Sequence, residues 1–112
     1  MNPEQQATMT AEVLATALDI DGDTRAFRDA AVARITQDGA GTKYFDADTG
    51  LMLFETMDLD KLVTYLEEEV LDIPNYCAML SARGVDPMVL SVIVEQAYMQ
   101  YAMLDVVRRS IT

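Results

Sequence analysis

The sequence predicts a mainly α-helical protein, a small helical bundle built on a long antiparallel helix pair over residues 58–83 and 87–109. Three observations predict this class. The chain has 112 residues, of which 51% are hydrophobic, so it can bury a core. Apolar residues recur at helical spacing through both long segments, and Gly84 lies between them. We expect a tail over residues 1–8 and a single helical domain over residues 9–112.

Two shorter helices are predicted in the first third of the chain. The first runs from Thr10, as its cap, to Leu18. The second is capped by Asp23 or Thr24 and runs to about residue 36. Its predicted buried stripe has one apolar residue every four positions: Phe27, Ala31 and Ile35.

A short β-hairpin is predicted over residues 42–55. Aromatic and apolar runs flank the turn sequence Asp46 to Gly50 on both sides. An isolated two-stranded hairpin is barely stable, so it must pack on helices. An irregular packed loop is the alternative.

The long helix pair carries clear start and stop signals. Asp58 caps the first helix, which extends to about Ala82, and Pro74 within it is expected to kink or divide it. Asp86 and Pro87 start the last helix. Apolar residues lie nearly all round that last helix, which predicts a partner subunit against it and a homodimer or other homo-oligomer.

Composition excludes several classes of function. The formal net charge of -11 disfavours nucleic-acid and anionic-membrane partners. The chain has no histidine, which removes histidine-based catalytic triads and most zinc sites. Cys77, the single cysteine, lies in an apolar run and is predicted to be a buried, inert thiol. The N-terminal residues show no signal-peptide pattern and the longest apolar run is too short to span a bilayer, so we expect a cytoplasmic location.

Carboxylates on the first long helix are the candidate metal ligands. Glu69 and Asp72 are three residues apart and Glu68 and Asp72 four apart, so each pair shares a helix face. A hard cation such as Mg²⁺ would offset their repulsion, whereas the plain alternative is a solvated acidic face. Glu95 is expected near the level of Asp72 in an antiparallel pair, held either by the metal or by hydrogen bonds to nearby tyrosine and asparagine side chains.

The run from Glu69 to Leu80 resembles the second metal-binding helix of the MazG-like nucleoside triphosphate pyrophosphohydrolases, including small phage-type relatives. That helix has an E-x-x-D pair, matched here by Glu69 and Asp72, before an aromatic-containing apolar stretch. The resemblance implies an all-helical oligomer, bound Mg²⁺, and cleavage of a nucleotide between its α- and β-phosphates. The upstream E-x-x-E motif of the family has no counterpart, since Glu12 stands alone and the second helix offers Asp29.

The missing motif leaves a second function open, a non-catalytic acidic helical protein that binds and regulates a partner, for instance a phage protein acting on a host protein. The methionines and tyrosines of the last helix would form an adaptable apolar surface. Two Asp-rich strings, Asp19 to Thr24 and Asp46 to Gly50, lack required calcium-loop ligands and are interpreted as a helix cap and a turn.

Overall fold

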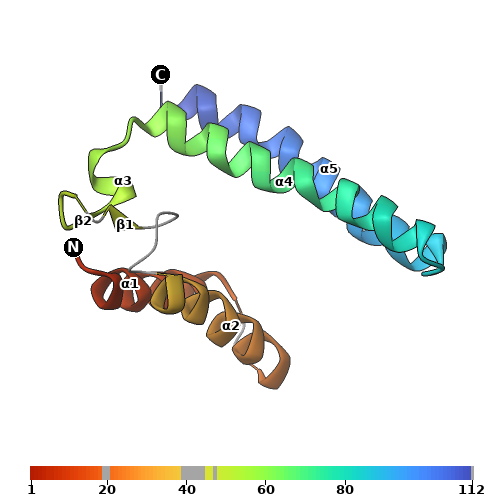
Figure 1. The fold of residues 1–112 in the computed structure, drawn as a ribbon, viewed down its shortest axis with the longest axis horizontal. Helices are drawn as coiled ribbons and strands as arrows, with labels where there is room; N and C mark the ends of the chain where they lie inside the picture. Colours follow the sequence, from red (N-terminus) through yellow and green to blue (C-terminus); the bar gives the residue numbers. More distant parts are fainter. Residues whose placement is uncertain (19–20, 39–44, 47, 112) are drawn as a thin grey trace. The chain divides into compact units, whose positions relative to one another are not determined.

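The computed structural model describes residues 1–18, 21–38, 45–46 and 48–111. Their contacts group into two compact units, Met1–Met57 and Asp58–Thr112. The sequence predicted one helical domain from residue 9 onward, and each unit is described here by itself. The prediction of a mainly helical fold with a short β-hairpin is confirmed (Figure 1).

Unit 1 begins with α1 (Pro3–Ala17), which starts seven residues before the predicted helix at Thr10. The prediction of a tail over residues 1–8 therefore misplaced the start of this helix. Asn2 caps it, because its side-chain Oδ1 accepts a hydrogen bond from the Gln5 backbone at 2.8 Å while the Gln5 side chain accepts one from the Asn2 backbone at 3.0 Å. Pro3 occupies the first helical turn, where its missing N–H costs nothing.

α2 (Gly22–Asp38) is capped by Asp21 and Thr24 acting on each other. The Thr24 backbone donates to Asp21 Oδ1 at 3.0 Å, and the Asp21 backbone donates to Thr24 Oγ1 at 2.8 Å. The hydrogen bonds that the Thr24 backbone and, at 3.2 Å, the Thr24 hydroxyl donate to Asp21 Oδ1 lower the pKa of the Asp21 carboxyl. The interpretation of the first Asp-rich string as a helix cap is confirmed for the part that is described, since Asp19 and Ile20 lie outside the described residues.

The predicted hairpin consists of two short strands. β1 (Phe45–Asp46) pairs antiparallel with β2 (Leu51–Met52), with Phe45 opposite Met52. The turn between them uses Gly50 at a φ of +73°, a left-handed conformation that glycine adopts without strain. Residues 42–44 of the predicted hairpin lie outside the described residues.

Leu53 and Phe54, predicted as strand, instead begin the short helix α3 (Leu53–Thr56). Glu55 fixes its start, since Glu55 Oε2 accepts a hydrogen bond from the Met52 backbone at 3.0 Å. The same carboxylate pairs with the terminal amine of Met1 at 2.6 Å, and this bond lowers the pKa of Glu55.

The core of unit 1 joins α1, α2 and the hairpin. Ala7, Ile35 and Met52 are buried together, with Val32 and Phe54 packed against them. Of the predicted stripe on α2, Ile35 is buried, whereas Phe27 is 62% exposed. The prediction for Phe27 was wrong because none of the elements described in unit 1 covers that turn of α2.

Unit 2 is a helical hairpin. α4 (Leu59–Ala82) and α5 (Pro87–Ser110) lie side by side over their whole length (Figure 1). Both predicted caps, Asp58 and Asp86, stand at the N-cap positions, and Asp86 Oδ1 accepts from the Met88 backbone at 2.9 Å. α4 continues through Pro74 as one helix, so the alternative that Pro74 divides it is wrong. Gly84, at a φ of +98°, reverses the chain between the helices.

Candidate functional site

The two helices of unit 2 meet along a seam, the line of buried and partly buried residues where they touch. Its residues recur at alternating intervals of four and three, which add to seven. On α4 the seam row contains three buried residues seven positions apart, Val63, Val70 and Cys77, and on α5 it contains Leu90, Ala97 and Leu104 at the same interval. An interval of seven keeps one face of a helix against its neighbour, as in a coiled coil. The predicted burial of the Cys77 thiol is confirmed.

Small side chains let the helices approach closely along this seam. Ala97 is buried against Val70, and Cys77 belongs to the same row. Four residues after each buried α4 residue lie Glu67, Pro74 and Ser81, which are partly buried. Burial on unit 2 is therefore confined to one narrow stripe of each helix.

A charged cluster closes the seam at the end remote from the turn. The Arg108 guanidinium pairs with Asp60 and Glu67 and donates a hydrogen bond to Thr64 Oγ1 at 3.3 Å. Partial burial opposes the charged form of Arg108, but the hydrogen bonds to Glu67 and Asp60 outweigh it and raise the pKa of Arg108. The cluster therefore fixes the register between the first turn of α4 and the last turn of α5.

On the described part of unit 2, more large apolar side chains are exposed than are buried. Among its described residues, 58–111, six apolar side chains are buried, whereas nineteen large ones are exposed. Fully burying one such side chain is worth about 1.5–3 kcal/mol, so covering six half-exposed ones would be worth roughly 5–9 kcal/mol. Patches of this extent are typical of protein-interaction surfaces.

The first exposed surface, called here the long face, runs along one flank of the seam. On α4, its residues each stand one position before a residue of the buried row or of the partly buried row, and Leu59 continues this pattern before Asp60. On α5, its residues hold the equivalent positions. On α4 they are Leu59, Leu62, Leu66, Glu69, Ile73, Tyr76 and Leu80, and on α5 they are Val89, Ile93, Gln96, Gln100, Met103 and Val107. In an antiparallel pair, equivalent flanking positions of the two helices lie on the same side of the seam, so these rows form one continuous face.

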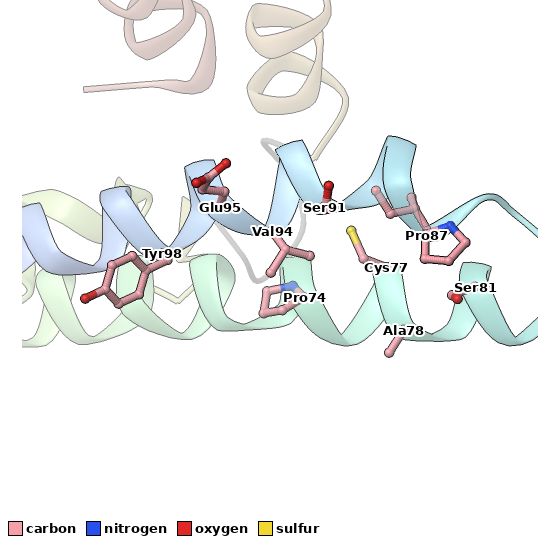
Figure 2. Close-up of a pocket in the computed structure, with 10 residues that line it drawn as sticks. Pro74, Cys77, Ala78, Ser81, Pro87, Ser91, Val94, Glu95 and Tyr98 are labelled. Carbon is pink, nitrogen blue, oxygen red and sulfur yellow. The ribbon is translucent and has the colours of Figure 1, made fainter.

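The second exposed surface, called here the turn groove, lies on the opposite flank and close to the turn (Figure 2). It is a shallow, open and mainly apolar groove. It is lined by Pro74, Cys77, Ala78, Ser81, Pro87, Leu90, Ser91, Val94, Glu95 and Tyr98. In Figure 2, Val94 and Pro74 lie against each other on its floor and the Cys77 Sγ points toward α5. The Tyr98 side chain is 71% exposed at one end of the groove, so it is available to a binding partner.

The four predicted metal ligands do not come together on the hairpin. Glu68 and Asp72 are exposed on the side of α4 that faces away from α5, because each lies about 200° round the helix from the buried Val70, whereas Glu69 lies on the long face. Glu95 is exposed at the rim of the turn groove (Figure 2). It lies near Pro74 in the chain direction, as predicted, but on another side of the hairpin from Asp72.

Within residues 1–18, 21–38, 45–46 and 48–111, no group of three or more acidic, histidine or cysteine side chains is placed to hold a metal ion. We therefore derive no catalytic step through Mg²⁺. In the described part of the chain, no helix has the length and apolar content needed to cross a membrane.

The Arg108 cluster and the turn groove were missed at the sequence level. The Arg108 cluster could have been found by extending the three-and-four spacing of the apolar seam to polar positions. That spacing places Asp60 and Glu67 in the α4 row and Arg108 in the α5 row.

Comparison with known proteins gives no match: no family model, no curated protein and no solved structure is similar to this chain. The resemblance to MazG-like enzymes therefore stays a prediction from the E-x-x-D run.

Proposed function

We propose that this chain is a non-catalytic acidic helical protein that binds a partner protein through the hairpin of α4 and α5. One observation carries the proposal, namely the excess of exposed over buried large apolar side chains on the described part of this unit. A catalytic protein needs reacting groups gathered in one place, and the candidate carboxylates are spread over different sides of the hairpin.

The turn groove is the surface that we assign to the partner. Ala78, Ser81 and Ser91 are small, which leaves room for side chains of an incoming helix between α4 and α5. Tyr98 provides a large exposed ring of the kind that dominates binding energy at interfaces. Glu95 at the rim, in a chain of net charge -11, favours a partner segment that carries a basic residue beside its apolar ones.

Site-specific photocrosslinking tests this proposal. A photoreactive phenylalanine analogue at Tyr98 is expected to crosslink one defined protein in cells that produce this chain, and the purified pair should bind in calorimetry. The matched control carries the same analogue at Tyr65, which is exposed on α4 outside the groove. Equal crosslinking from both positions would refute the assignment of the groove.

A second candidate function, a MazG-like nucleotide pyrophosphohydrolase or a degenerate relative, rests on one observation. Glu69 and Asp72 are exposed three residues apart on α4, so a nucleotide-bound cation could reach both. If this function is correct, the chain releases pyrophosphate from deoxynucleoside triphosphates with Mg²⁺, and Asp72→Ala abolishes the release. Mg²⁺ should also raise the unfolding midpoint, because binding to the folded state alone stabilises it. Absence of turnover by the pure protein would eliminate this candidate.

A further inference from the structure

We propose that the long face packs against the long face of a second copy of this chain, with both turns at the same end, to form a four-helix bundle. The long face and the turn groove lie on opposite flanks of the seam, so this inference does not depend on the function proposed for the groove.

The size of the long face matches what a stable dimer requires. Each helix has 24 residues and is therefore about 36 Å long. Two packed helices present a face roughly 20 Å wide, or about 700 Å² per copy, close to the roughly 800 Å² per partner of a standard interface. The face is apolar at both ends, with Leu59 and Val107 at one end and Leu80 and Val89 at the other, and carries Glu69, Gln96 and Gln100 in its middle.

The polar residues on the long face favour a second copy of this chain as its partner, in one orientation. A two-fold axis along the hairpin places α4 of one copy over α5 of the other at the same level. Glu69 of each copy then lies level with Gln96 and Gln100 of the other copy, whose amide groups can donate hydrogen bonds to a carboxylate.

The charged residues beside the turn also favour an arrangement with both turns at the same end. Arg83 stands directly after α4 as its C-cap and Asp86 directly before α5 as its N-cap, so both lie at the turn end of the long face. With the turns at the same end, Arg83 of each copy lies level with Asp86 of the other, and two ion pairs form. With the turns at opposite ends, Arg83 would instead meet the apolar residues near Leu59, and Glu69 would meet Ile73. The same-end arrangement is therefore the one that places Arg83 level with Asp86, and Glu69 level with the two glutamines, of the other copy.

Sedimentation of the full chain tests the dimer. We expect twice the 12.4 kDa chain mass at micromolar concentration, and Leu66→Lys should shift the protein to a monomer. The matched control is Leu71→Lys, since Leu66 and Leu71 are 50% and 47% exposed on the same helix but on opposite flanks of the seam. Met103→Lys on α5 is a second variant with the same expected loss, and circular dichroism confirms that each variant keeps its helices.

Spin labels at residue 85 test the orientation. Val85 lies in the turn, and a Val85→Cys label in a Cys77→Ala background should report a distance between copies much shorter than a helix length of about 36 Å. A distance near or above that length overturns the same-end arrangement. A monomeric wild-type chain, or dimer loss in Leu71→Lys as well, overturns the dimer itself, and both results leave the photocrosslinking test of the groove intact.

Discussion

At the residue scale, a small number of side chains determine how closely the two long helices approach. Ala97 is 4% exposed and packs with Val70 and Leu104. A larger side chain at this position has no free space, since the neighbouring helix occupies it. The contact also shows why the seam is narrow, because residues one position away from Ala97 on either side, Gln96 and Tyr98, are exposed.

Ala97→Leu is therefore expected to destabilise the hairpin by about 1–3 kcal/mol through overpacking. Chemical denaturation followed by circular dichroism measures the change. Ala102→Leu is the matched control, because Ala102 is exposed on the same helix and should change stability by less than about 0.5 kcal/mol. Equal effects of the two variants would show that Ala97 is not part of a tight seam.

The Asp21 cap predicts a pH dependence for α2. The hydrogen bonds from Thr24 hold the folded-state pKa of Asp21 below its ordinary value of 3.8. A lowered pKa stabilises the folded state above the unfolded-state pKa, and this contribution is lost as the pH falls through the folded-state pKa. Asp21→Asn keeps an acceptor oxygen and cannot titrate, so its stability should fall less between pH 5 and pH 2 in the same denaturation experiment. Identical pH profiles for the two proteins would contradict this role of the carboxylate.

Sequence reasoning at this scale succeeded where a residue's local pattern determines its environment. Cys77 is buried as its apolar run predicts, and Asp58 and Asp86 stand at helix starts as predicted. It failed for Phe27, because helical spacing identifies an apolar face without showing whether another element covers it.

At the element scale, capping signals decided which helix boundaries could be predicted. The ends of α4 and α5 follow from Asp58, Gly84 and the Asp86–Pro87 pair. The true start of α1 was also encoded, since Asn2 and Gln5 form a capping box with Pro3 between them, but the weak apolar pattern of residues 3–9 hid it. α3 was missed because four residues are too few for helical periodicity to appear.

Asn2→Ala should destabilise unit 1 by about 1 kcal/mol, the usual cost of losing a helix N-cap. Thr8→Ala on the exposed side of the same helix provides the comparison, since its hydroxyl bonds the Glu4 carbonyl within the helix and caps nothing. Thermal unfolding measures both variants, and an unchanged midpoint for Asn2→Ala would contradict the observed start of α1.

Pro74 lies inside α4 and removes one backbone donor from that helix. We expect Pro74→Ala to stabilise the hairpin by up to about 3 kcal/mol, less the packing that the ring provides in the turn groove. Pro87→Ala is the control, because Pro87 stands in the first turn of α5, where proline is favoured. A larger gain in unfolding midpoint for Pro87→Ala than for Pro74→Ala would contradict this explanation.

At the scale of the whole molecule, the sequence predicted more burial than the chain achieves by itself. It correctly predicted two long helices in antiparallel contact, and it predicted a partner for the last helix from the apolar residues all round it. What it could not give is which flank of the hairpin takes which partner. That assignment depends on the seam, and the seam is defined by Val63, Val70 and Cys77 on α4 rather than by the whole apolar pattern.

The candidate metal site was likewise only partly predictable from the sequence. The spacing of Glu68, Glu69 and Asp72 predicts neighbouring carboxylates on α4, but spacing within one helix cannot show what lies opposite them. Across the described residues the acids of α4 and Glu95 lie on different sides of the hairpin, and apolar surface is the most prominent feature of unit 2.

Photocrosslinking from Tyr98 measures the central claim most directly, because it asks whether protein covers the turn groove in the cell. The account predicts one defined crosslinked protein from position 98 and none from position 65, with the crosslink lost when Ala78→Glu fills the groove with a charged side chain. The absence of any crosslinked protein from position 98, or an unchanged crosslink in the Ala78→Glu variant, would contradict the account.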